Sequence, residues 1–135
     1  MTCAFVFPGQ AVQAVGMGRE LLAAFPIARQ TLEEVDDALG QNLTKLIAEG
    51  PAEDLTLTEN AQPALMSISM AAMRVLETEG NFQFDKVAAF VAGHSLGEYS
   101  ALAASNSFEL SDAAKLLKTR GQAMQAAVPI GEGGM

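Results

Sequence analysis

A serine between two glycines is the residue of this chain best placed to act as a nucleophile. Gly93, Ser95 and Gly97 match the pattern of the nucleophile elbow, a sharp turn from a strand into a helix. The apolar run 86–92 predicts a short buried strand before the turn, and residues 96–104 predict a helix after it. We interpret Ser95 as a nucleophile, with glycines that remove side chains which would crowd the turn and that allow unusual backbone angles, and with a helix N-terminus that favours negative charge. The alternative is an ordinary turn rich in glycine and serine.

The single histidine of the chain, His94, directly precedes this serine. A serine nucleophile needs a base that accepts its proton. A side chain adjacent to the nucleophile in a tight turn points elsewhere, so we do not expect His94 to be the base. We interpret it as a turn residue or a substrate contact. The base is then absent from this chain, or it is not a histidine.

Two backbone N–H groups could stabilise a negative oxygen beside Ser95. One belongs to Leu96, the residue after the nucleophile. The second normally comes from a loop that follows another strand. The apolar run 3–7 predicts such a strand, and residues 8–10 follow it, at the same edge of a parallel sheet as the elbow. The N–H of Gln10 is our candidate, and the alternative is an ordinary loop glutamine.

Arg120 lies on the apolar face of a helix predicted over residues 112–128. Its stripe comprises Ala113, Leu117, Arg120, Met124 and Ala127. A second stripe, predicted to face outward, comprises Lys115, Lys118, Gln122 and Gln125. A buried guanidinium needs an anion. The anion could be an internal carboxylate, such as Glu98 or Glu109, or a substrate carboxylate, which the planar fork of arginine suits.

The elements that must position these residues alternate between strands and helices. Strands are predicted over 3–7 and 86–92, and helices over 17–25, 27–39, 43–48, 64–79, 96–104 and 112–128. Residues 52–60 are expected to be turn-like, and Ser111 to cap the last helix. Two apolar strands separated by helices imply a parallel pair in an α/β fold. Because a parallel sheet needs more strands to bury itself, we expect the chain to be part of a larger protein.

Composition excludes several classes of partner. The chain has 135 residues, of which 50% are hydrophobic, and carries 16 acidic against 8 basic residues. This net charge of -8 argues against nucleic-acid binding and against attraction to an anionic membrane. Cys3 is the single cysteine, so no intrachain disulfide forms, and no metal-ligand cluster is evident. Without a signal-peptide pattern or a membrane-length apolar run, we expect a cytoplasmic protein.

Four separated motifs occur in order along the chain. They are Phe7-Pro8-Gly9-Gln10, Gln62-Pro63-Ala64-Leu65, the stretch from Gly93 to Leu102, and Arg120-Gly121-x-x-Met124-Gln125. Together they resemble the bacterial malonyl-CoA:acyl carrier protein transacylases of type II fatty-acid synthesis. The resemblance implies a ping-pong transfer from malonyl-CoA, through a malonyl-serine, to the phosphopantetheine thiol of acyl carrier protein. Coenzyme A and phosphopantetheine are then parts of substrates, and neither a cofactor nor a metal is implied.

The resemblance also implies a role for each matched residue. Ser95 would carry the malonyl group, and Arg120 would bind its carboxylate. The backbone N–H groups of Gln10 and Leu96 would form the oxyanion hole. Gln62 would line the active site. The histidine beside the nucleophile, residue 94, would lie at the site without being its base.

Two departures from this family affect the expectation. The first loop reads Gly9-Gln10-Ala11-Val12-Gln13, where the family has Gly-Gln-Gly-Ser-Gln. If the replaced glycine has a positive φ, Ala11 costs on the order of 1 kcal/mol. Val12 also removes a loop hydroxyl.

The second departure is length, since members of this family are considerably longer. We expect residues 1–128 to be the N-terminal part of a partial α/β-hydrolase-like parallel sheet flanked by helices. Residues 129–135 would begin a connection to a missing ferredoxin-like subdomain, and the missing portion would contain the catalytic histidine. A serine esterase or hydrolase and a non-catalytic truncated scaffold are the alternatives.

Overall fold

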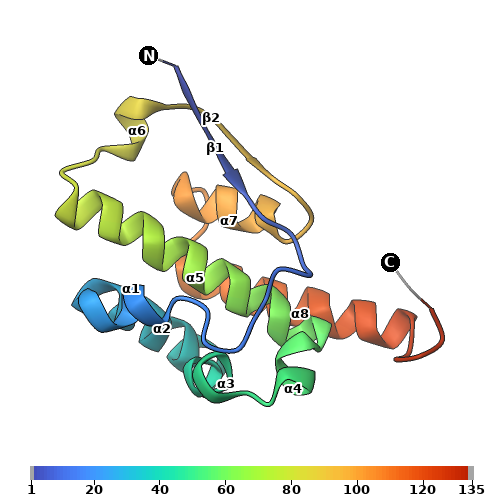
Figure 1. Ribbon diagram of the computed structural model, residues 1–135. Helices are drawn as coiled ribbons and strands as arrows, with labels where there is room; N and C mark the ends of the chain where they lie inside the picture. The colour runs from blue at the N-terminus through green and yellow to red at the C-terminus, as the bar shows by residue number, and fades with distance from the viewer. Residues whose placement is uncertain (1, 134–135) are drawn as a thin grey trace.

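The computed structural model describes residues 2–133, which form two strands and eight helices. In chain order these are β1 (Cys3–Phe7), α1 (Arg19–Ala24), α2 (Pro26–Leu39), α3 (Leu43–Glu49), α4 (Ala52–Thr56), α5 (Thr58–Glu79), α6 (Phe84–Val87), β2 (Ala88–Gly93), α7 (Gly97–Ala104) and α8 (Leu110–Ala127). The strand pair lies at the top of Figure 1, with α7 below it and α5 below α7. The architecture is therefore a partial α/β fold.

The core gathers around α5, the longest helix, with 22 residues. Apolar residues occur on most sides of this helix, and its first half is almost entirely buried, from Asn60 to Ser67. Leu32 and Val35 of α2 and Leu117 of α8 belong to the same buried cluster. Burial on several sides explains why the apolar residues of α5 do not form a single narrow stripe. Neither α5 nor another helix within residues 2–133 has the length and hydropathy needed to cross a membrane.

The two strands pair in parallel, as the sequence predicts. Phe5 lies opposite Val91 in the register, and Phe7 lies opposite Gly93. Side chains alternate across a strand, so Phe5 turns inward and packs edge-on against Phe82 and Phe84, with ring centroids 5.6 and 5.0 Å away. This pairing brings the loop after β1 to the same edge of the sheet as the turn after β2.

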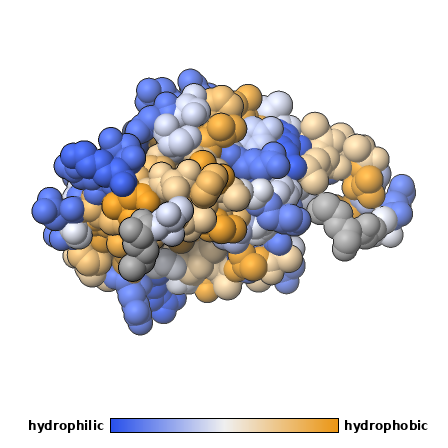
Figure 2. Space-filling model, turned by 90° about the horizontal axis from the view of Figure 1, so that it is seen from above, coloured by the Kyte–Doolittle hydropathy of each residue, from blue (hydrophilic) through white to orange (hydrophobic). Residues whose placement is uncertain are grey.

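The predicted burial of the second strand is wrong. Phe90 is 68% exposed and Val6 of β1 is 74% exposed, because no element within residues 2–133 covers the outer face of the pair. Figure 2 looks onto the molecule from above, where hydrophobic residues gather across the middle of the surface. Parallel strands are ordinarily buried on both faces. In the described part of the chain, helices cover the inner face of this sheet.

Four local predictions also differ from the structure. Residues 52–60 are helical rather than turn-like, since they form α4 and the first turn of α5. The long helix therefore begins before Pro63, whose ring is fully buried inside α5, so packing outweighs the usual cost of an interior proline. Glu109, not Ser111, is the N-cap residue of α8. Residues 84–87 form the short α6, and the strand after it begins at Ala88.

Candidate active site

Ser95 occupies the turn between the end of β2 and the start of α7. Its φ is 57°, in the left-handed region that non-glycine residues rarely adopt. The turn is closed by two backbone hydrogen bonds, from Gly97 N–H to the His94 carbonyl (2.9 Å) and from Glu98 N–H to the Ser95 carbonyl (3.1 Å). Backbone strain of this kind is typical of the nucleophile elbow, where it exposes the serine hydroxyl at the edge of the sheet.

The two flanking glycines serve close packing rather than unusual backbone angles. Neither Gly93 nor Gly97 has a positive φ, so the expectation about their backbone angles is wrong. A Cβ atom on Gly93 would overlap the backbone of Gly97. A Cβ atom on Gly97 would lie 2.8 Å from the carbonyl oxygen of Pro8 and closer still to that of Phe7. The absence of both side chains lets α7 begin directly against β1 and its loop.

The Ser95 hydroxyl is in contact with the guanidinium of Arg120. Arg120 Nη2 donates a hydrogen bond to Ser95 Oγ at 3.1 Å, and Nη1 donates to Gln62 Oε1 at 2.7 Å. The other end of the Gln62 amide donates to Met124 Sδ at 3.3 Å. Gln62 is fully buried, so these two bonds satisfy both ends of its side chain. Residues from α5 and α8 thus meet at the turn that holds Ser95.

Arg120 has no carboxylate partner within residues 2–133. The ion pairs in this part of the chain join Arg74 to Glu34 and Lys118 to Glu59. The interpretation that Arg120 forms an ion pair with Glu98 or Glu109 is therefore wrong. The guanidinium instead lies over the ring of Tyr99, 5.8 Å from its centroid. Its positive charge is thus available to an anion beside Ser95.

The loop after β1 lies next to the turn that holds Ser95, as expected from the parallel pairing. His94 N–H donates to the Phe7 carbonyl at 3.2 Å. Gln10 Nε2 donates to Thr58 Oγ1 at 3.3 Å, which ties the loop to α5. The backbone N–H groups of Gln10 and Leu96 have no hydrogen-bond acceptor within residues 2–133. The two amides remain the candidate oxyanion hole.

His94 lies beside the loop after β1 rather than on Ser95. A Cβ atom on Gly9 would overlap His94 Nδ1, so the imidazole packs against the glycine. Ser95 Oγ has its hydrogen bond with Arg120, and the sequence offers no second histidine. The residues described here can hold an anion and present a hydroxyl, but they do not supply an imidazole base. The same part of the chain contains no group of three His, Cys, Asp or Glu side chains that could hold a metal ion.

The first loop carries strain at the position where the family resemblance implies a glycine. Ala11 has a φ of 87°. Its N–H donates to Gln13 Oε1 at 2.8 Å, which helps to hold this conformation. Alanine pays a steric cost in the left-handed region that glycine does not. The alanine therefore stores strain next to Gln10.

Ala11→Gly is expected to stabilise the protein by about 1 kcal/mol, because relief of the strain exceeds the added flexibility of the unfolded chain. Urea denaturation followed by circular dichroism measures the change. Ala14→Gly is the matched control, since Ala14 is exposed in the same loop and its φ is not positive. The control should lose stability. An equal loss in both variants would show that the alanine at position 11 is not strained.

Only half of the polar stripe of α8 faces solvent as predicted, since Gln122 is exposed but Gln125 is half-buried. Lys115 is exposed, but Lys118 is half-buried and its Nζ lies 3.0 Å from Glu59 Oε2 on α5. The hydrogen bond from Lys118 is the main reason that the pKa of Glu59 is lowered from its usual value of 4.5. No local pattern predicts this contact, because the sequence predicts a non-helical segment over residues 52–60, where α5 begins.

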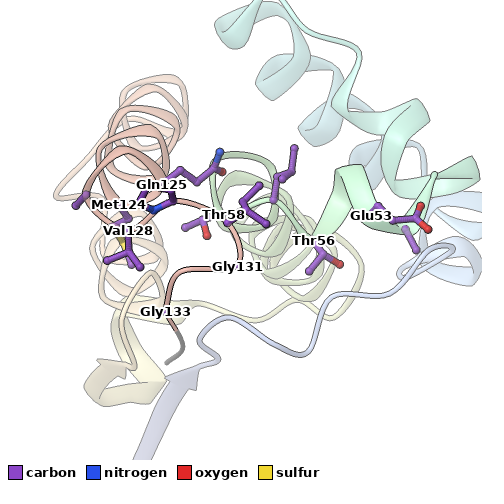
Figure 3. Close-up of a pocket in the computed structure, with 13 residues that line it drawn as sticks. Glu53, Thr56, Thr58, Met124, Gln125, Val128, Gly131 and Gly133 are labelled. Atoms are coloured by element: carbon purple, nitrogen blue, oxygen red, sulfur yellow. The ribbon is translucent and has the colours of Figure 1, made fainter.

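A cavity of ≈ 700 Å³ adjoins the site at the C-terminal end of α8. Figure 3 shows Met124, Gln125 and Val128 on one side of it and Thr56 and Thr58 on the other. Met124 accepts the hydrogen bond from Gln62, and Thr58 accepts the one from Gln10. The wall of the cavity thus includes hydrogen-bond partners of Gln10 and Gln62.

The chain is similar to several known proteins. A family model described as "Acyl transferase domain" matches residues 4–135. The chain is 48% identical over 132 residues to the malonyl CoA-acyl carrier protein transacylase of Salmonella typhimurium, covering 98% of this chain and 41% of that protein. Among solved structures, the acyl-carrier-protein-S-malonyltransferase from Bartonella henselae is 58% identical, with a TM-score of 0.93 over 97% of this chain and 41% of that one.

A second similar structure contains a bound protein. It is a malonyl-transacylase in complex with a type II PKS acyl-carrier protein, 44% identical, with a TM-score of 0.86 over 93% of this chain and 40% of that one. The chain therefore spans about two-fifths of the length of the relatives it matches.

Proposed function

The chain belongs to the acyl transferase domain family, and on that premise we propose that it carries the nucleophile and the carboxylate-binding arginine of a malonyltransferase. The observation on which this rests is the contact of Ser95 Oγ, at 3.1 Å, with an arginine that has no carboxylate partner within residues 2–133. The complete reaction would move a malonyl group from malonyl-CoA to acyl carrier protein. It would also require residues that this chain does not contain.

The first half-reaction would form an ester on the serine. Ser95 Oγ attacks the thioester carbonyl carbon of malonyl-CoA, and the carbon–sulfur bond breaks to release coenzyme A. The negative oxygen of the tetrahedral intermediate accepts hydrogen bonds from the N–H groups of Gln10 and Leu96. The serine proton goes to a base outside this chain and then to the departing thiolate. In the second half-reaction the carrier thiol attacks the ester and restores the serine.

The arginine would select the acyl group. In malonyl-serine one methylene separates the ester carbonyl from the free carboxylate, so this carboxylate stays close to the atom that was attacked. Arg120 Nη2 already lies 3.1 Å from Ser95 Oγ, which becomes the ester oxygen bonded to that carbonyl, and Gln62 fixes the orientation of the guanidinium. A planar guanidinium binds a carboxylate through two parallel hydrogen bonds. An acetyl group has no carboxylate, so it would leave the positive charge of Arg120 unpaired. Transfer of an acetyl group is therefore disfavoured.

The named substrates and partner derive support from the relatives. The Salmonella typhimurium protein is a transacylase for malonyl CoA and acyl carrier protein, and one solved relative is bound to an acyl-carrier protein. We extend both substrates to this chain as part of the proposal. A role in fatty-acid synthesis and a cytoplasmic location belong to the same proposal, as do the boundary at residue 128 and the absence of a cofactor.

The experiment compares residues 1–135 with the full-length protein in which this chain occurs. Each is mixed with malonyl-CoA and acyl carrier protein, and malonyl carrier protein is followed by mass spectrometry. We expect steady transfer by the full-length protein and none by residues 1–135, because a histidine base is missing from the latter. Release of free malonate without transfer would identify a hydrolase. No reaction by the full-length protein would identify a non-catalytic scaffold.

A further inference from the structure

The ammonium group of Lys118 is held by three acceptors, two from α5 and one from the segment that connects α2 to α3. Its Nζ donates to Gln41 Oε1 at 2.9 Å and to Asn60 Oδ1 at 3.0 Å, and it pairs with Glu59 Oε2 at 3.0 Å. An ammonium group has three donors, so this lysine is fully satisfied. Only 21% of its side chain is exposed, which is a buried position for a lysine on the surface of a helix.

Glu59 is the residue that α8 contacts repeatedly. Gln122 Nε2 donates to Glu59 Oε2 at 3.2 Å, and Gln125 Oε1 accepts from Glu59 N–H at 2.6 Å. Gly121 lies directly on the backbone there, since a Cβ atom on it would be 2.5 Å from Glu59 Cα. Lys118, Gly121, Gln122 and Gln125 follow helical spacing, so one face of α8 is fixed to the first turn of α5.

The same two helices also meet at the candidate site. Gln62 follows Glu59 by three residues on α5, and it holds Arg120 on α8. Arg120 follows Lys118 by two residues and directly precedes Gly121. A rotation or a shift of α8 against Glu59 would therefore move the guanidinium relative to Ser95 Oγ.

We propose that Lys118 and Glu59 are a positioning pair, which fixes α8 on α5 and thereby sets where the Arg120 guanidinium lies relative to Ser95. The inference rests on the proposed function and deepens it, because it assigns malonyl selection to residues beyond those that touch the substrate. Displacement of a catalytic or binding group by about 1 Å can lower a rate by roughly 100-fold. Neither residue of the pair contacts Ser95, so both act through Arg120.

The test replaces Lys118 with methionine in the full-length protein in which this chain occurs. Methionine keeps an unbranched apolar stem and removes all three donors. Formation of acyl-serine is measured with malonyl-CoA and with acetyl-CoA, whose acyl group has no carboxylate. We expect kcat/KM for malonyl-CoA to fall by about tenfold or more, since the guanidinium is displaced, while the value for acetyl-CoA stays within about twofold. Lys118→Arg, which keeps the charge and the donors, should restore much of the difference.

Control variants separate positioning from general loss of structure. Lys115→Met removes an exposed lysine from the same helix and should leave kcat/KM unchanged for both substrates. The melting temperature of each variant is measured in parallel. Equal losses with malonyl-CoA and acetyl-CoA, or no loss at all, would overturn the inference while leaving the proposed function in place. Failure of the unsubstituted protein to form malonyl-serine would overturn both.

Discussion

Arg120→Gln is expected to remove selectivity for malonyl-CoA. Loss of one partner from a desolvated, hydrogen-bonded charge pair costs about 2–5 kcal/mol, and here that pair is the guanidinium and the malonyl carboxylate. The rate of malonyl-serine formation, as kcat/KM, should therefore fall by roughly 10²- to 10³-fold. Acetyl-CoA should react at least as fast as before, because its acyl group leaves no carboxylate unpaired.

Two further variants define the role of this arginine. Arg120→Lys keeps the positive charge but lacks the planar guanidinium, which binds a carboxylate through two parallel hydrogen bonds. It should therefore recover only part of the lost kcat/KM. Arg29→Gln is the matched control, because Arg29 is an exposed arginine on α2 that donates to main-chain carbonyls of α1. It should behave as the unsubstituted protein. If Arg120→Gln slowed acyl-serine formation equally with malonyl-CoA and acetyl-CoA, Arg120 would stabilise the turn or orient Ser95 rather than bind the malonyl carboxylate.

Ser95→Ala is expected to abolish acyl transfer, with a loss on the order of 10³-fold or greater. Alanine and serine both carry a Cβ atom at the positive φ of this turn, so the substitution should keep the fold. Stopped-flow release of coenzyme A measures the loss, and circular dichroism checks the structure.

Ser100→Ala is the matched control for the serine. Ser100 is a fully buried serine one turn along on α7, and its hydroxyl has no hydrogen-bond partner within residues 2–133. Its removal should leave acylation unchanged and stability equal or slightly higher. A Ser95→Ala variant that still released coenzyme A at an unchanged rate would show that another group is the nucleophile.

The elements of the fold that the sequence predicts correctly are those with strong local signals. The parallel pairing of 3–7 with the second apolar strand follows from two apolar runs separated by helices, and the structure confirms it. The inward position of Arg120 follows from helical spacing. In the structure its guanidinium contacts Ser95 Oγ. The suspected positive φ at Ala11 also occurs.

The features that the sequence does not predict depend on contacts between distant segments. Pro63 suggests a helix start, yet burial of its ring keeps it inside α5. Lys118 resembles a solvated charge until α5 brings Glu59 beside it. The exposure of Phe90 depends on what covers the outer face of the sheet, which no local pattern reveals. Tertiary packing decides each of these positions.

The most direct test of the central claim is to locate the acyl group on the protein. The full-length protein in which this chain occurs is mixed with malonyl-CoA alone, quenched with acid, digested and analysed by tandem mass spectrometry. We expect a malonyl ester on the peptide that contains Ser95, and we expect it to disappear when acyl carrier protein is added before quenching. A malonyl group on another side chain, such as Cys3, with Ser95 unmodified would contradict the central claim.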